Sequence, residues 1–181
     1  MQKMTITEAL AKTKILKAKI TSRKESTSQN LGRMDITPDP FEKEDGGSAG
    51  KIKRDFQAMA DFRLSLVATR TAIQNVNSVT RLRIGEREMS VTDWLNWKRE
   101  VADEELAFLK QAQTSIQQLK NQNERSPQVL KDKETGESRI LKPVFNIDQA
   151  WLEKQIDIVQ TTLGELDGKL SMLNATTFIE V

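Results

Sequence analysis

The stretch RLRIGEREMSVTDW groups three arginines in a few residues, and it is the first part of the chain whose residue types suit a ligand. The arginines are Arg81, Arg83 and Arg87, and Asn75 and Asn77 precede them. A guanidinium group binds phosphate oxygens through paired hydrogen bonds. This cluster therefore predicts a site for a small anionic ligand such as a nucleotide.

Acidic residues are interleaved with these arginines and offer another interpretation. Glu86 and Glu88 stand in the same stretch, and no glycine-rich phosphate loop accompanies them. The arginines can then be neutralised by salt bridges within the chain or between subunits. We favour the salt bridges, and the ligand site stays open as the alternative.

A second set of residues with chemical potential is acidic and falls in two later helices. Two carboxylates at i and i+3 on facing helices can hold Mg²⁺. Glu100 and Asp103 have this spacing, but Glu153 and Asp157 are four residues apart. A solvated helix face is the favoured interpretation, and we expect no metal site. The full set is Glu100, Asp103, Glu104, Glu105, Glu153, Asp157, Glu165 and Asp167.

The chain lacks histidine, cysteine and tyrosine altogether. This removes the side chain that most often serves as general base near neutral pH, every thiol nucleophile and every Ser-His triad. We predict that the protein is not an enzyme and carries no cofactor.

Three tryptophans, Trp94, Trp97 and Trp151, each stand near the start of a predicted helix. Their rings could stack on nucleic-acid bases, but packing in a core or an interface is the favoured role.

The N-terminal segment is predicted to be a basic helix over residues 1–21, with a capping box at Thr5 and Glu8. Residues 1–24 hold seven Lys or Arg against one acidic residue, whereas the chain as a whole has a net charge of +2. Such a helix can bind nucleic acid or pack on acidic parts of the protein, and we favour packing. Residues 22–50 lack apolar periodicity and are rich in polar residues, Pro and Gly, which predicts a flexible loop.

Residues 51–181 are predicted to form a helical coiled-coil domain. Apolar residues recur at spacings of three and four in a long helix from about Val91 to Asn123 and in the last helix. The long helix carries a second apolar stripe, so we expect more than one neighbour for it, as in a homo-oligomer. The predicted core or oligomer seam consists of Leu106, Leu109, Ile116, Leu152, Ile156, Val159, Leu163, Leu166, Leu170 and Leu173. The second stripe of the long helix consists of Trp94, Trp97, Val101, Phe108, Ala112 and Leu119.

Two segments alternate apolar and polar residues around a glycine, which predicts β-hairpins near residues 79–90 and 128–145. Ser90 is expected to cap the long helix and Asn146 the last one. The C-terminal TTFIEV has strand character and is expected to pair with a hairpin edge. The predicted fold is therefore mainly all-α, an elongated antiparallel helical bundle or coiled coil with two short β-hairpins between helices.

Three stretches resemble the septicolysin-like family of small helical bacterial and phage proteins. They are TITEALAKTKILKAKI, NVNSVTRLRIGEREMSVTDWLNWKREV and LEKQIDIVQTTLGELDGKLSMLNATTFIEV. The resemblance as a whole extends over about two thirds of the chain and excludes residues 22–50. Ala175 departs from the tryptophan that the family tends to carry there. The resemblance implies a helical bundle that self-associates, and it brings no catalytic residues.

We therefore expect a non-enzymatic, self-associating helical protein with a structural or assembly role, plausibly phage-encoded. Its expected partners are further copies of itself and other virion or assembly proteins. No segment is apolar for long enough to span a membrane, and we expect a cytoplasmic protein, in the host cell or in a virion. The alternative is an oligomeric protein that sequesters a small anionic ligand at the arginine-bearing hairpin.

Overall fold

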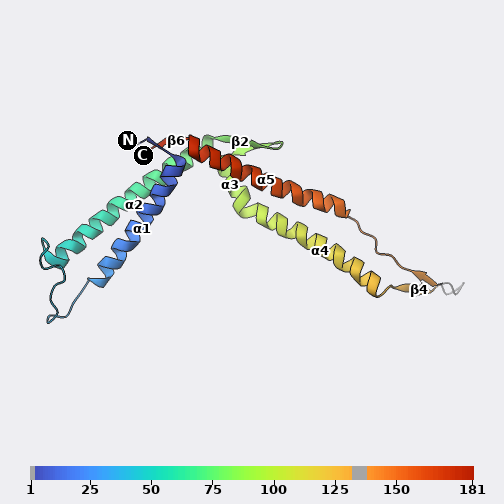
Figure 1. Cartoon of the computed structure of the whole chain (residues 1–181), viewed down its shortest axis with the longest axis horizontal. Coiled ribbons are helices and arrows are strands. Elements are labelled where there is room, and N and C mark those ends of the chain that lie inside the picture. The colour runs from blue at the N-terminus through green and yellow to red at the C-terminus, as the bar shows by residue number, and fades with distance from the viewer. Residues whose placement is uncertain (1–2, 132–137) are drawn as a thin grey trace. The chain divides into compact units, whose positions relative to one another are not determined.

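A computed structural model describes residues 3–131 and 138–181 of the chain (Figure 1). It is mainly helical with short two-stranded antiparallel sheets, which confirms the predicted fold class. The elements in order are β1 (Lys3–Thr5), α1 (Ile6–Gln29), α2 (Gly47–Val79), β2 (Arg81–Ile84), β3 (Arg87–Ser90), α3 (Val91–Trp97), the π-helical turn η1 (Lys98–Ala102), α4 (Asp103–Arg125), β4 (Val129–Lys131), β5 (Ser138–Ile140), α5 (Gln149–Thr176) and β6 (Phe178–Glu180).

The chain forms two compact units. Unit 1 comprises Met1–Thr80 and Leu170–Val181, and unit 2 comprises Arg81–Lys169. This division differs from the predicted one, which placed residues 51–181 in a single domain. The difference arises because α2 packs mainly on α1, and the C-terminal end of α5 joins them through Leu173.

In unit 1, α1 and α2 lie side by side and run in opposite directions (Figure 1). The predicted capping box is present, since the Thr5 hydroxyl accepts from the Glu8 amide and the Glu8 carboxylate accepts from the Thr5 amide. The core of this unit gathers apolar side chains from both helices and both chain ends. It consists of Met4, Ile6, Ala9, Ile73 and Ile179, with Ala72, Val76, Leu173 and Val181 packed against them.

The basic helix is longer than predicted, because α1 continues past residue 21 to Gln29. An ion pair explains the extension: the Arg23 guanidinium binds the buried carboxylate of Asp55 on α2, which also accepts from Lys51 Nζ at 3.1 Å. The predicted loop is correspondingly shorter and ends where α2 begins at Gly47. It is pinned there by Asp39, whose carboxylate accepts from the Ser48 amide at 3.0 Å.

In unit 2 the first predicted hairpin is confirmed as β2 and β3, which pair antiparallel around Gly85. Gly85 has a φ of 55°, a left-handed conformation that glycine adopts without steric cost. Ser90 caps the helix that follows, as predicted, because its hydroxyl accepts from the Asp93 amide at 3.1 Å. The Trp94 indole is fully buried and donates from Nε1 to the Leu82 carbonyl at 2.9 Å, which fixes the hairpin to α3.

The predicted long helix runs through α3, η1 and α4, and its α4 part packs against α5. The second predicted hairpin is present as β4 and β5, and its Glu-Thr-Gly-Glu turn lies outside the described residues. The expected cap at Asn146 is wrong, because α5 begins three residues later. Asp148 takes the capping role there, and its carboxylate accepts from the Ala150 amide at 3.3 Å.

The C-terminal strand is also different from the prediction. β6 pairs with β1 and not with a hairpin edge, and the buried side chains of Met4 and Ile179 face each other in the register. The Ile6 amide extends the pairing by donating to the Thr177 carbonyl at 3.0 Å. β1 comprises three residues, too few for a pattern of alternation to reveal it in the sequence.

Candidate functional site

The arginine hairpin does not direct its three guanidinium groups to one face. Arg83 is the cross-strand partner of Glu88, whereas Arg87 is the partner of Ile84. Because successive strand residues point to opposite faces, Arg81 and Arg83 lie on one face of the hairpin and Arg87 on the other. The predicted set of three arginines is therefore split by the strand register.

The other predicted members of this ligand site belong to α2. Asn75 and Asn77 fall in unit 1, whereas the three arginines fall in unit 2. Asn75 is exposed, and the Asn77 Oδ1 atom is buried without a hydrogen-bond partner among the described residues.

The predicted salt bridges from Glu86 and Glu88 to these arginines are not formed within the described part of the chain. Across residues 3–131 and 138–181, no ion pair within 4.0 Å joins either glutamate to Arg81, Arg83 or Arg87. The hairpin backbone is held instead by Lys169 of α5, whose ammonium donates to the Arg83 carbonyl. The hairpin is thus joined to α3 through Trp94 and to α5 through Lys169.

The acidic residues singled out in the sequence lie in η1, α4 and α5. In the part of the chain that the structure describes, no three Asp or Glu side chains are placed to hold a metal ion together. Several of these carboxylates are instead engaged by basic neighbours: Glu165 pairs with Lys169 at 2.7 Å, and Asp167 binds Lys98 Nζ at 2.5 Å. The favoured interpretation is a solvated helix face, and the structure adds that some of these exposed carboxylates pair with lysines.

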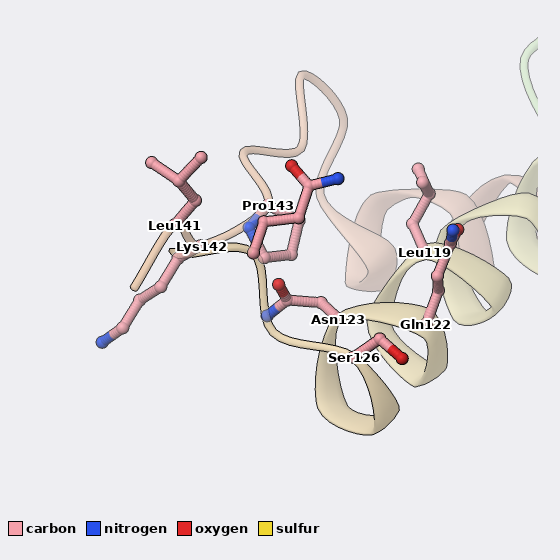
Figure 2. A pocket seen from close by; sticks show the side chains of 8 residues that line it. Leu119, Gln122, Asn123, Ser126, Leu141, Lys142 and Pro143 are labelled. Carbon is pink, nitrogen blue, oxygen red and sulfur yellow. The ribbon is translucent and has the colours of Figure 1, made fainter. Parts of the chain in front are cut away.

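An open pocket of about 360 Å³ lies where the C-terminal end of α4 meets the segment after β5 (Figure 2). Asn123 and Ser126 line it from the α4 side and Lys142 and Pro143 from the other. Its polar groups are amides, one hydroxyl and one ammonium, with no carboxylate among the lining residues. Such a set can hold polar groups by hydrogen bonding.

The predicted seam is occupied within the chain. Leu109 of α4 packs with Leu152, Ile156 and Val159 of α5 in one buried cluster. Leu106, Ile116 and Leu163 pack against this cluster, Leu166 is fully buried, and Leu173 packs in unit 1. These residues therefore stabilise the folded chain, and a contact between copies needs another surface.

A second set of apolar side chains on α4 and α5 remains uncovered. The exposed fractions are 68% for Phe108, 51% for Leu119, 50% for Trp151 and 48% for Ile158. Phe108 and Leu119 are eleven residues apart, close to three full turns, and Trp151 and Ile158 are seven apart, close to two turns. Each pair therefore forms a stripe along its own helix.

The two stripes lie on the same side of the α4–α5 pair. Phe108 directly precedes the buried Leu109, and Ile158 directly precedes the buried Val159. In an antiparallel pair of right-handed helices, the residue before a core position projects to the same side on both helices.

The stripes also lie at matching heights along the pair. The Lys120 ammonium donates to Gln149 Oε1 at 2.7 Å, which sets Leu119 beside the start of α5 and near Trp151. We call the surface made of Phe108, Leu119, Trp151 and Ile158 the α4–α5 apolar face.

Sequence reasoning found half of this face. Phe108 and Leu119 belong to the predicted second stripe of the long helix. For Trp151 the sequence predicts packing in a core or an interface, and for Ile158 it gives no separate prediction. Ile158 could have been found from its seven-residue spacing from Trp151. The longer heptad of apolar residues in the same helix made this short repeat easy to overlook. The other two tryptophans pack as expected, with the rings of Trp94 and Trp97 edge to face at 5.6 Å.

Comparisons with known proteins return no match: no family model, no curated protein and no solved structure resembles the chain significantly. The resemblance to the septicolysin-like family therefore stays a prediction. Among the described residues, no helix is both long and apolar enough to cross a membrane.

Proposed function

We propose that this chain is a non-enzymatic, self-associating helical protein with a structural or assembly role, and that copies meet through the α4–α5 apolar face. The observation that carries the proposal is the uncovered face itself, which lies directly beside a well-packed seam.

The size of the face supports a contact between proteins. An aromatic side chain presents roughly 150 to 250 Å², so the exposed fractions of the four residues leave on the order of 400 Å² of apolar surface. Monomeric proteins rarely expose apolar patches larger than a few hundred Å² unless the patch is functional. A standard interface buries about 800 Å² on each partner, roughly 56 to 65% of it nonpolar. The face thus supplies most of the apolar area that one side of a dimer needs.

A second copy of the chain is the partner that this face fits. The stripes are carried by two antiparallel helices, and two such pairs can pack face to face as a four-helix bundle. The aromatic residues Phe108 and Trp151 provide the large side chains that carry most of the binding energy in protein interfaces.

The setting of this role is also part of the proposal. A helical scaffold of this kind fits a phage-encoded protein in the host cytoplasm or in a virion, in contact with other assembly proteins. The predicted resemblance to the septicolysin-like family supports this setting.

Light scattering coupled to size-exclusion chromatography tests the proposal. The wild type is expected to elute as a stable oligomer at micromolar concentration, whereas Phe108→Glu should shift it to the 20.6 kDa monomer. The glutamate would place an unpaired charge inside the contact. The matched control is Leu64→Glu on α2, a residue of similar exposure at 71% outside the face, which should leave the oligomer intact. A monomeric wild type would refute the proposal.

A further inference from the structure

In α1 and α2, several residues that directly follow a core position in the sequence are Lys or Arg. In α1, Lys14 follows the buried Thr13 and Lys17 follows the buried Leu16. In α2, Arg70 follows the buried Thr69, and Arg63 follows the half-buried Phe62, whose ring centroid lies 5.5 Å from Lys19 Nζ on α1.

Because α1 and α2 are antiparallel, the residue after a core position projects to the same side on both helices. Lys24 joins this side because it follows Arg23, whose guanidinium binds Asp55 on α2. The five cations Lys14, Lys17, Lys24, Arg63 and Arg70 form one surface, which we call the basic face.

The cations of the basic face are exposed and have no acidic partner. All five side chains are exposed, and none of them takes part in an ion pair or hydrogen bond with the residues the structure describes. The carboxylates of these helices lie elsewhere: Asp55 is buried between them, Glu8 caps α1, and Asp61 accepts from Gln57 at 3.0 Å. Glu25 is exposed two residues after Arg23, which places it on the side of α1 that points away from α2. The positive charge of this face is therefore available to a partner.

The spacing of the cations suits a phosphate backbone. Lys14 and Lys24 are ten residues apart, about 15 Å along the helix, and Arg63 and Arg70 are about 10 Å apart. The two rows are separated by roughly the 8 to 10 Å between packed helix axes. Duplex DNA carries one negative charge per about 1.7 Å of its axis, so several phosphates fall within reach of this surface at once.

We infer that the basic face binds nucleic acid through its phosphates, without reading the base sequence. A membrane surface is the less suitable partner, because interfacial helices need a continuous apolar stripe to insert. The apolar residues on this side, Leu10, Phe56 and Val67, alternate with the cations instead. The inference does not depend on the α4–α5 apolar face and goes beyond the proposed structural role.

The test is fluorescence anisotropy with a labelled DNA duplex of about two helical turns, titrated with the full chain at several salt concentrations. The wild type is expected to bind, with an affinity that falls steeply with salt. The variant Lys17→Gln/Arg63→Gln/Arg70→Gln should bind at least about tenfold more weakly, and its slope against log salt should be shallower by about 2 to 3. Circular dichroism of the variant verifies that it is folded.

The matched control removes the same charge from unit 2: Lys110→Gln/Arg125→Gln/Arg139→Gln, all three exposed. It should bind DNA nearly as the wild type does. Equal weakening in both triple variants would overturn the inference, since it would then reflect net charge alone. Absence of wild-type binding at low salt would also overturn it, as would binding to anionic phospholipid vesicles but not to DNA.

Discussion

Substitutions at two adjacent residues of α4 test two different contributions to stability. Leu109 reports on packing within one chain, and Phe108 reports on the proposed contact between copies. Leu109 is 6% exposed within the α4–α5 cluster, whereas Phe108 is 68% exposed on the apolar face. Leu109→Ala should lower the free energy of unfolding by about 2 to 3 kcal/mol, the lower part of the range for buried leucines. The lower part applies because the cluster joins only two helices, so water and neighbouring side chains can fill the space.

Phe108→Ala is expected to act differently. About a third of Phe108 is covered within one chain, roughly 50 to 80 Å² of an aromatic side chain, so its removal should cost about 1 to 2 kcal/mol at about 25 cal/mol per Å². The same change removes a large aromatic from the proposed interface. Its main effect should therefore appear in the concentration dependence of stability, since binding of a second copy stabilises the folded state by mass action.

Urea unfolding followed by circular dichroism at two protein concentrations, about tenfold apart, measures both effects. For wild type and Leu109→Ala, the midpoint should rise with protein concentration, and for Phe108→Ala it should not. The reasoning would be refuted if Phe108→Ala destabilised the chain as much as Leu109→Ala at low concentration. That result would place Phe108 in the core of a single chain.

Three further predictions concern contacts elsewhere in the molecule. Burial alone would raise the pKa of Asp55, but hydrogen bonds from Lys51 and Arg23 and their charges bring it below its usual value. The stabilisation by this carboxylate is thus present above the unfolded pKa of about 3.9 and is lost as pH falls through the lower folded pKa. Asp55→Asn should cost about 1 to 3 kcal/mol at pH 7 and flatten the acid limb of an unfolding titration; an unchanged pH profile would argue against the ion pair. Ser90→Ala should cost about 0.5 to 2 kcal/mol in thermal unfolding because it removes the cap of α3, and no change would show that the cap is dispensable. The triple change Arg81→Gln/Arg83→Gln/Arg87→Gln should leave circular dichroism and assembly unchanged, since exposed charges of this kind contribute about 0 to 1 kcal/mol. Calorimetry with nucleotides and cyclic dinucleotides examines the alternative function, and micromolar binding by the wild type that the triple variant loses would favour it.

The features that the sequence predicted well are determined by neighbouring residues. The capping box at Thr5 and Glu8, the Ser90 cap and the turn at Gly85 each depend on a few adjacent positions, and all three are present. The heptad of the last helix predicted the cluster around Ile156, because the strongest apolar spacing in α5 coincides with its buried side.

The features that the sequence did not predict depend on contacts between distant segments. The pairing of β1 with β6 joins the two ends of the chain. The extension of α1 to Gln29 depends on Arg23 meeting Asp55 across the α1–α2 pair. The division of the arginine cluster follows from strand register, which sequence proximity does not reveal.

Sequence patterns also could not distinguish which apolar stripe is covered within one chain. Both stripes of the long helix have helical periodicity, and only the position of α5 buries Leu109 and leaves Phe108 exposed. The same applies to the cations of α1 and α2. Their common side appears only once the helices are known to pack antiparallel.

The central claim, that copies meet through the α4–α5 apolar face, is tested most directly by a distance measured between copies. The chain contains no cysteine, so Gln111→Cys places a single spin label at an exposed position of α4 on the edge of this face, three residues after Phe108. Double electron–electron resonance on the labelled protein should then show a defined short distance between copies, and adding Phe108→Glu should abolish it. A label at Thr21→Cys on α1, outside the face, serves as the control for nonspecific association. If the Gln111 label gave only the background decay of separate molecules while light scattering showed an oligomer, the contact between copies would lie elsewhere and the account would be contradicted.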